Sequence, residues 1–166
     1  MSRRAAIGAA HGNSVLPAPE DAFSVGPLVG RVRSVLLSSL DGELQPFGIT
    51  ATQFGILKHV AEGTARTAAD LCRVLHYDTG SMSRMVDRLE EKELIRRERS
   101  KDDRRQVTLR VTPAGRAALP RLRDIAARVI ASMLAGFSAG EVHDLKRYLD
   151  RMIENGQAAH HAGARV

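Results

Sequence analysis

The sequence is poor in cysteine and in aromatic residues. Cys72 is the only cysteine among 166 residues, which excludes an intrachain disulfide and suits a reducing compartment such as the cytoplasm. Tryptophan is absent and aromatic residues make up only 4% of the chain, so a core must consist mainly of Leu, Val, Ile, Met and Ala. No apolar run is long enough to span a membrane. We therefore expect a cytoplasmic protein with an aliphatic core, in which Cys72 is a buried structural residue.

Recognisable catalytic motifs are also missing. The sequence contains no phosphate-binding glycine motif, no HExxH zinc motif and no nucleophile elbow. Its six histidines are scattered, and nothing pairs a nucleophile with a base at a recognisable spacing. The adjacent His160 and His161 have no nearby acid or cysteine to complete a metal site. We therefore expect a protein that is not an enzyme and that uses no metal or other cofactor.

Positive charge is what the sequence has in excess, and the excess is local. The net charge is +6 and the isoelectric point is about 10.2, which favours a polyanionic partner such as nucleic acid or an anionic membrane. Seven basic and three acidic residues lie between positions 96 and 110, so this segment alone contributes a net +4. Simple solubility is the alternative explanation, but it does not require concentrated charge.

Spacing and capping motifs predict the helices. From 24 to 44 apolar residues recur every three or four positions, which predicts a helix with Pro27 in its first turn. Capping boxes, in which two side chains satisfy each other's free amides, predict helix starts at Thr50, Thr67 and Ser138. Asp78 is the predicted N-cap of a helix running to about residue 93. Its inner face carries Met82, Met85, Val86 and Leu89.

Residues 94–99 and 106–112 predict a β-hairpin that follows this helix. In the second stretch Val107, Leu109 and Val111 alternate with polar residues, which is the pattern of a half-buried strand. The charged residues between the two stretches then form the end of the hairpin.

The helices that precede the hairpin complete a winged helix-turn-helix. A short helix at 67–75, a tight turn and the helix at 78–93 have the required order. The apolar stripes of the outer helices have no partner in so small a domain, so we expect them to pack on a second copy. The predicted fold class is mostly α with a small β-hairpin wing and an α-helical dimerisation region. The predicted segments are a disordered extension (1–20), a dimerisation helix (21–49), the winged helix-turn-helix (50–112), C-terminal dimerisation helices (113–156) and a flexible tail (157–166).

One long stretch carries a family resemblance. The residues DTGSMSRMVDRLEEKELIRRERSKDDRRQVTLRVTPAG, positions 78–115, resemble the signature of the MarR-family transcriptional regulators. The likeness extends in order over about residues 24–155. It implies an obligate homodimer, a double-stranded DNA operator and, in many members, a small effector; no membrane partner is expected.

The helix at 78–93 is the predicted DNA-reading element. An α-helix fits the major groove, and its N-terminal residues reach the base edges. Small residues there permit close approach, hydroxyls contact bases or phosphates, and arginines reach guanine or phosphate. The alternative is an ordinary solvated helix face. The predicted DNA-binding residues of this helix are Thr79, Gly80, Ser81, Ser83, Arg84 and Arg88.

The charged end of the hairpin is the second predicted DNA contact. Arg105 matches the wing-tip arginine of the resembled family, and an arginine there can enter the narrow minor groove. Lys101 and Arg104 are predicted phosphate contacts. Asp103 would be repelled by phosphate, so we interpret it as an intramolecular partner that orients an arginine. A solvated polar hairpin is the alternative.

The resemblance also implies a pocket for a small aromatic carboxylate or phenolic effector. Arg31 and Arg33 flank the first apolar stripe and can pair with a carboxylate, and His59, His76 and Tyr77 can add hydrogen bonds or stacking. Solvated arginines, or arginines in interchain salt bridges, are the alternative.

Three functions are compatible with these features. The first is a homodimeric repressor that binds a pseudo-palindromic operator and is released by an effector. The second is an architectural nucleic-acid-binding module without an effector. The third is a winged helix whose basic surface binds an acidic protein. The sequence does not identify the operator, the regulated genes, the effector or the direction of regulation.

Overall fold

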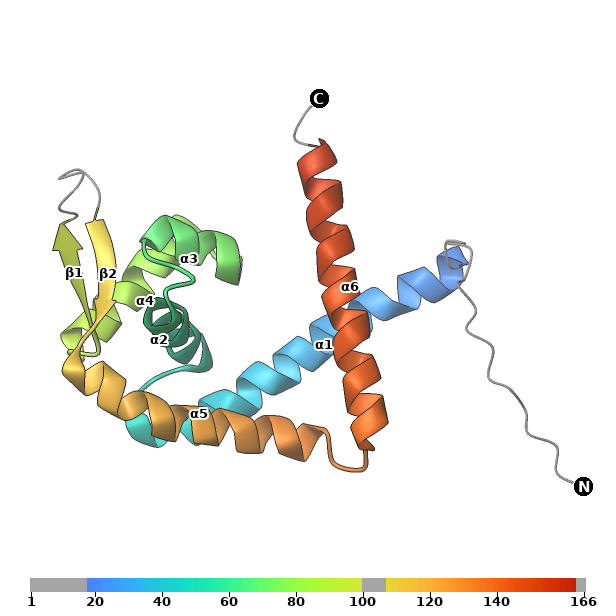
Figure 1. Ribbon diagram of the computed structural model, residues 1–166, viewed down its shortest axis with the longest axis horizontal. Coiled ribbons are helices and arrows are strands. Elements are labelled where there is room, and N and C mark those ends of the chain that lie inside the picture. The colour runs from blue at the N-terminus through green and yellow to red at the C-terminus, as the bar shows by residue number, and fades with distance from the viewer. Residues whose placement is uncertain (1–17, 100–106, 164–166) are drawn as a thin grey trace, which may run out of the picture. The chain divides into compact units, whose positions relative to one another are not determined.

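The computed structural model describes residues 18–99 and 107–163 and has the predicted mostly helical class (Figure 1). The chain divides into two compact units, one ending at Val35 and the other beginning at Leu36. Within the described residues the first unit holds only the N-terminal part of the first helix. The elements are α1 (Pro19–Leu44), the 3-10 helix η1 (Gln45–Phe47), α2 (Ala51–Glu62), α3 (Ala68–Leu75), α4 (Thr79–Glu91), β1 (Ile95–Arg99), β2 (Val107–Val111), α5 (Pro113–Met133) and α6 (Ala139–Gly163).

The predicted capping boxes form at the starts of three helices. At α2 the Gln53 amide donates to Thr50 Oγ1 at 3.2 Å, and the Thr50 amide donates to Gln53 Oε1 at 3.0 Å. The same reciprocal bonds join Thr67 to Asp70 at α3. The Arg66 amide also donates to Asp70, and these bonds, the Arg66 bond foremost, lower the pKa of Asp70. A third box opens α6. These starts are therefore fixed by local hydrogen bonds, as the sequence predicts.

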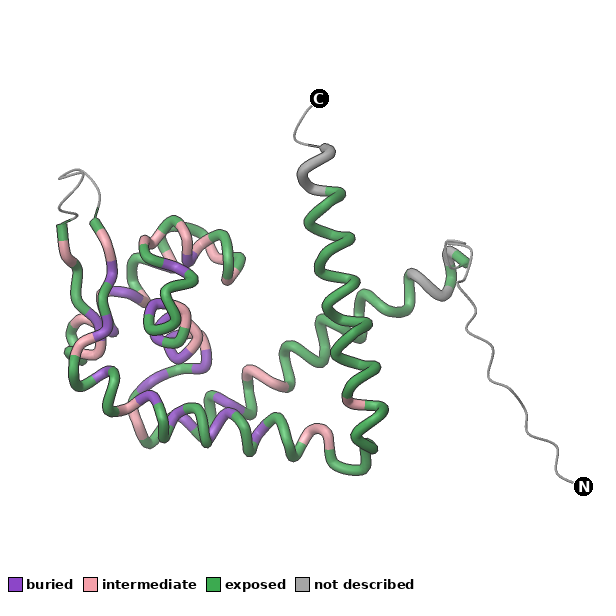
Figure 2. The backbone as a smooth tube through the Cα atoms, in the orientation of Figure 1, coloured by how far each residue is buried: buried purple, intermediate pink, exposed green. Residues whose placement is uncertain are grey.

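The core lies in the unit that begins at Leu36 and is aliphatic. Figure 2 shows the buried positions gathered in α2, α3, α4, the hairpin and α5. Helix α2 packs against α3, α4, α5 and β2, so it forms the centre of this unit. The largest fully buried side chains are Leu44, Ile56, Leu57, Leu71, Met82, Leu89, Ile95, Leu122 and Val86. No helix within residues 18–99 and 107–163 combines the length and apolar character needed to cross a membrane.

The structure differs from the predicted element bounds at both ends of the chain. Helix α1 begins at Pro19, so Pro27 lies inside the helix and not in its first turn. The carbonyl that loses its partner belongs to Phe23, which is 83% exposed, so solvent can satisfy it. Helix α6 continues to Gly163, whereas a flexible tail was predicted from residue 157. No proline interrupts this alanine-containing stretch, and nothing local stops the helix.

The predicted inward face of β2 is only partly buried. Leu109 and Val111 are in the core, but Val107 is 44% exposed. Val107 pairs with Arg99 at the far end of the hairpin. The hairpin therefore extends beyond the core, and alternation alone did not reveal where burial ends.

The base of the hairpin is held against α5 by a close backbone approach. The Thr112 amide donates to the Leu94 carbonyl at 3.1 Å. A Cβ atom on Gly115 would overlap the Leu94 carbonyl oxygen and would lie 2.8 Å from Val111 Cγ1. Only glycine therefore allows the first turn of α5 to approach the start of β1 this closely.

We expect Gly115→Ala to lower the free energy of unfolding by about 1–3 kcal/mol, because the added methyl group must displace backbone. Chemical denaturation followed by circular dichroism measures this. Gly42→Ala is the matched control, since its Cβ would meet no atom within 4 Å. In the helix interior that exchange should be neutral or stabilising by roughly 0.5–1 kcal/mol. Equal effects of the two substitutions would contradict the close-approach explanation.

Candidate nucleic-acid interface

Helices α3 and α4 form the predicted helix-turn-helix. Helix α3 ends at His76, which adopts a left-handed conformation with φ of 56° and turns the chain sharply. Tyr77 follows, and its hydroxyl lies 3.0 Å from Thr52 Oγ1 near the start of α2. Asp78 then caps α4 by accepting a hydrogen bond from the Ser81 amide at 2.8 Å. The turn is thus closed by backbone geometry and anchored to α2.

Helix α4 buries one face and presents the other to solvent. Met82, Val86 and Leu89 are buried against the core, as predicted. On the remaining surface Ser81 is half-buried and its hydroxyl accepts a hydrogen bond from Arg84 Nη2 at 3.1 Å. The other predicted DNA-binding residues of this helix are exposed, namely Thr79, Gly80, Ser83, Arg84 and Arg88.

The N-terminal end of α4 carries a fixed negative charge. Hydrogen bonds from Ser81, its backbone amide first, hold the pKa of Asp78 below its ordinary value. Asp78 therefore remains ionised and accepts a hydrogen bond from a free backbone amide in the first turn of α4. The exposed arginines one and two turns further along, Arg84 and Arg88, are left as the cationic groups of the exposed face.

The hairpin is antiparallel and its side chains separate onto two faces. Arg97 is opposite Leu109, and Arg96 is opposite Arg110. Because successive strand residues point to opposite sides, Arg97 lies on one face and Arg96 and Arg110 lie on the other. The adjacent arginines of β1 therefore have different surroundings.

Arg97 joins the hairpin to α4. Its guanidinium donates to Asp87 Oδ1 at 2.6 Å and to Glu90 Oε2 at 2.5 Å, and its amide donates to Glu90 Oε1 at 2.9 Å. Partial burial by itself would lower the pKa of Arg97, but the hydrogen bonds to both carboxylates raise it above its ordinary value. The arginine also offsets two negative charges on α4 that would repel phosphate.

This ion-pair network was not predicted from the sequence. The sequence interpretation assigned the arginine-orienting role to Asp103, whereas within the described residues Asp87 and Glu90 hold Arg97. The sequence nevertheless carried a signal for this network. Asp87 and Glu90 are three positions apart, which places both on one side of α4, and an arginine follows in the next strand. The predicted wing-tip residues Lys101, Asp103, Arg104 and Arg105 lie outside the described residues.

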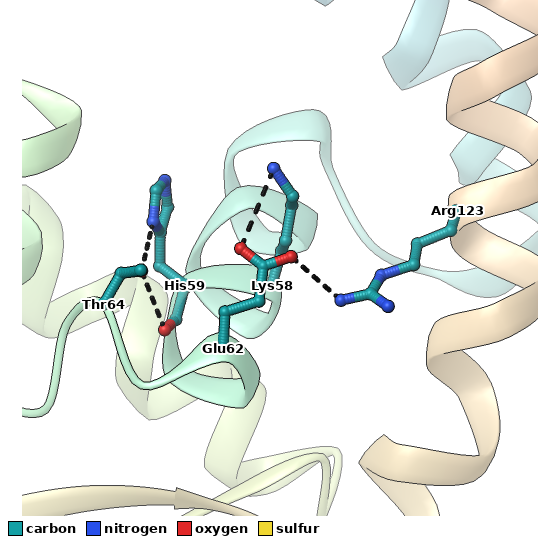
Figure 3. Close-up of polar contacts among 5 residues, drawn as sticks. All are labelled: Lys58, His59, Glu62, Thr64 and Arg123. Atoms are coloured by element: carbon teal, nitrogen blue, oxygen red, sulfur yellow. Dashed lines mark hydrogen bonds and ion pairs between the residues drawn. The ribbon is translucent and has the colours of Figure 1, made fainter.

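The predicted effector residues do not form one cluster. His59 Nδ1 lies 2.8 Å from Thr64 Oγ1 just beyond the C-terminal end of α2 (Figure 3). Tyr77 contacts Thr52 at the other end of that helix, and seven residues correspond to about 10 Å along a helix axis. His76 is the exposed C-cap of α3. Arg31 and Arg33 are exposed and belong to the other unit.

A pocket that the sequence did not indicate lies between η1 and α5. It has a volume of about 310 Å³ and is lined by Phe47, Ile49, Leu94 and Leu122 together with Arg121. The guanidinium carbon of Arg121 lies 4.6 Å from the centre of the Phe47 ring. An apolar pocket with one arginine suits a small ring that carries a carboxylate.

Comparison with known proteins gives matches over most of these elements. The MarR family model matches residues 47–106. The multiple antibiotic resistance protein MarR of Salmonella typhimurium is 37% identical over 93 residues, which are 56% of this chain and 65% of that protein. The chain thus matches slightly less than two thirds of this relative's length. An HTH-type transcriptional repressor of Mycobacterium tuberculosis is 26% identical over 80% of this chain and 95% of its own length.

Solved structures match over a longer part of the chain. A mutant of Escherichia coli MarR in complex with operator DNA is 27% identical, with a TM-score of 0.70 over 80% of this chain and 96% of that chain. The transcriptional regulator BldR from Sulfolobus solfataricus is 21% identical, with a TM-score of 0.76 over 84% of this chain and 99% of that chain. The second match, at its low identity, concerns the fold alone.

We expect Arg97 and Asp87 to stabilise the protein as a coupled pair. A double-mutant cycle of Arg97→Gln and Asp87→Asn, measured by chemical denaturation, should give a coupling of roughly 1 kcal/mol that decreases with added salt. The exposed pair Lys146 and Asp150 on α6, with a separation of 3.1 Å, is the control and should couple more weakly. A coupling no larger than that of the control would show that Arg97 does not hold the hairpin to α4.

Proposed function

We propose that the chain is a member of the MarR family and that it regulates transcription by binding duplex DNA. The observation that carries the proposal is the exposed face of α4. Arg84 and Arg88 lie there among small and hydroxyl-bearing residues, while the acids Asp87 and Glu90 are paired with Arg97. A helix with these properties fits the major groove, where arginine reads guanine or contacts phosphate.

The wing supplies the second DNA contact in this proposal. Arg105 enters the minor groove, Lys101 and Arg104 contact phosphates, and Asp103 orients one of the arginines. The attachment of β1 to α4 through Arg97 supports a wing that acts together with the helix. The salt dependence of DNA affinity separates these roles, because loss of one phosphate contact lowers its slope by about one unit.

We propose that the DNA-binding species is a homodimer. Large apolar side chains with helical spacing are exposed on α1 and on α6, and each of the two helices offers an apolar stripe of the kind that oligomers bury. They are Phe23, Val25, Leu28, Val29, Val32 and Val35 on α1, and Leu145, Tyr148, Leu149, Met152 and Ile153 on α6. Two copies of α4 then lie about one helical turn of DNA, roughly 34 Å, apart and read a pseudo-palindrome.

We propose further that the protein is a repressor released by a small aromatic carboxylate or phenolic effector. Two sets of residues are candidates for binding the carboxylate of such a molecule: Arg31 and Arg33 on α1, and Arg121 in the pocket between η1 and α5. Release requires the effector to prefer, by a few kcal/mol, a dimer whose two α4 helices no longer match successive grooves over the dimer that binds DNA. Titration of the DNA complex with benzoic and salicylic acids, repeated with Arg31→Ala, Arg33→Ala and Arg121→Ala, separates the two sets.

We expect Arg84→Ala and Arg88→Ala each to weaken operator binding by about 1–3 kcal/mol, the usual cost of one specific contact. The operator is first obtained by selecting bound DNA from a random pool, and affinities are then measured by mobility shift. Arg128→Ala, the same charge change at an exposed position of α5, should have little effect.

The footprint on the selected DNA distinguishes the three candidate functions. Protection of a short inverted repeat supports the sequence-specific regulator. Diffuse protection would instead indicate an architectural module, and no protection would indicate a winged helix that binds an acidic protein. Either of the last two results would overturn the proposal.

We expect the protein to sediment as a dimer at micromolar concentration. Leu149→Glu should shift this equilibrium towards monomer, because it places a charge within the exposed stripe of α6. Lys146→Glu on the same helix is the control, since Lys146 is already exposed and polar. A monomeric parent protein, or equal effects of the two substitutions, would contradict the proposed interface.

A further inference from the structure

A basic pocket lies on the hairpin face opposite Arg97. Four arginines line it together with Glu98, and its volume is about 510 Å³. Two of them, Arg96 and Arg110, come from the hairpin; the others come from the α2–α3 connection and from the first turn of α5. We call it the arginine pocket, and its arginines are Arg66, Arg96, Arg110 and Arg116.

Among the described residues, the two hairpin arginines share a single carboxylate. Arg96 and Arg110 are directly opposite each other in the register, an arrangement that is unfavourable for like charges. Glu98 lies between them, with Oε1 at 2.5 Å from Arg96 Nη2 and Oε2 at 3.5 Å from Arg110 Nε. One negative charge therefore offsets two positive charges on this face.

The other two arginines are positioned by hydrogen bonds that leave their charge unpaired. The Leu109 amide donates to the Arg66 carbonyl at 2.8 Å, which fixes residue 66 beside β2. Arg116 Nη1 donates to the Val111 carbonyl at 2.8 Å, which fixes that side chain against the base of the hairpin. Among residues 18–99 and 107–163, no carboxylate forms an ion pair with Arg66 or Arg116.

The second acid that lines the pocket is already occupied. Glu62 Oε1 accepts a hydrogen bond from Arg123 Nη2 at 2.9 Å, and Glu62 Oε2 lies 3.9 Å from Lys58 Nζ. Figure 3 shows the Glu62 carboxylate directed towards these two partners, neither of which lines the pocket. Glu62 is therefore engaged elsewhere and does not neutralise the pocket arginines.

We propose that the arginine pocket binds a small anion that carries at least two phosphate or carboxylate groups. Four arginines outnumber Glu62 and Glu98 in the lining, so the pocket is net positive and attracts anions. Planar guanidinium groups also match phosphate and carboxylate oxygens in pairs. Four arginines spread over one cavity fit an anion with two separated charges better than they fit a monoanion. The residues Val60, Leu109 and Val111 also line the pocket.

The position of the pocket favours a small molecule over the DNA backbone. The pocket lies on the hairpin face that points away from the Arg97 contact with α4. An anion bound there would connect both strands to the end of α2 and the start of α5, and would hold the hairpin in place.

Isothermal titration calorimetry of the full-length protein with sodium pyrophosphate and with citrate tests the proposal, at constant ionic strength and without DNA. We expect one site per chain and slower amide exchange in the hairpin when it is filled. Arg66→Ala should weaken binding by about tenfold, as loss of one charged hydrogen bond does. Glu98→Gln should strengthen binding, because Glu98 competes with the anion for Arg96 and Arg110. Arg128→Ala, with the same loss of charge outside the pocket, should bind as the parent does.

Two results would overturn the proposal. One is the absence of saturable binding, or an equal loss of affinity in Arg66→Ala and Arg128→Ala, which would indicate non-specific attraction to a basic protein. The other is that neither anion binds, while Arg66→Ala lowers the affinity for DNA and also lowers the slope of its salt dependence by about one unit. That result would assign the pocket to duplex phosphates. Because the calorimetry contains no DNA, its outcome is independent of whether the protein regulates transcription.

Discussion

The carbonyl group of Leu94 is the point on which the part of the structure that we propose binds DNA depends. It accepts hydrogen bonds from the amide of Thr112 at 3.1 Å and from the hydroxyl of Thr112 at 3.3 Å, and Gly115 packs directly over it. The end of α4, both strands of the hairpin and the start of α5 therefore meet at one peptide group. Arg97 lies three residues further along β1, so its reach to Asp87 and Glu90 depends on that junction.

The parts of the fold that the sequence predicted are those determined by neighbouring residues. Capping boxes at Thr50 and Thr67 need only four consecutive residues, and both form as expected. Helix α1 starts earlier than predicted because an internal proline is tolerated where the unpaired carbonyl is exposed, and α6 ends later because no proline or other local signal stops it. The approach of Gly115 to Leu94 joins residues 21 positions apart, and no spacing rule predicts such a contact.

The candidate site likewise has a part that the sequence predicted and a part that it did not. The exposed residues of α4, among them Arg84 and Arg88, follow from helical periodicity, because burial of Met82, Val86 and Leu89 determines which side faces solvent. The effector residues were chosen for their chemistry, and their positions depend on tertiary structure. A pocket needs side chains from several elements to converge, and single-sequence patterns carry no information about convergence.

The described arginines Arg96, Arg97 and Arg110 of the hairpin serve two different physical purposes, and the alternation of strand side chains separates them. On one face Arg97 meets two carboxylates from α4 and acts as an intramolecular link. On the other face Glu98 is the one carboxylate of the described residues that pairs with Arg96 and Arg110, which leaves the described part of that face positive. A net charge summed along the sequence cannot distinguish these cases, because it counts a neutralised arginine and a free one equally. The local excess of charge therefore predicts an anionic partner, but only the register of the hairpin identifies which of the described arginines remain available to bind one.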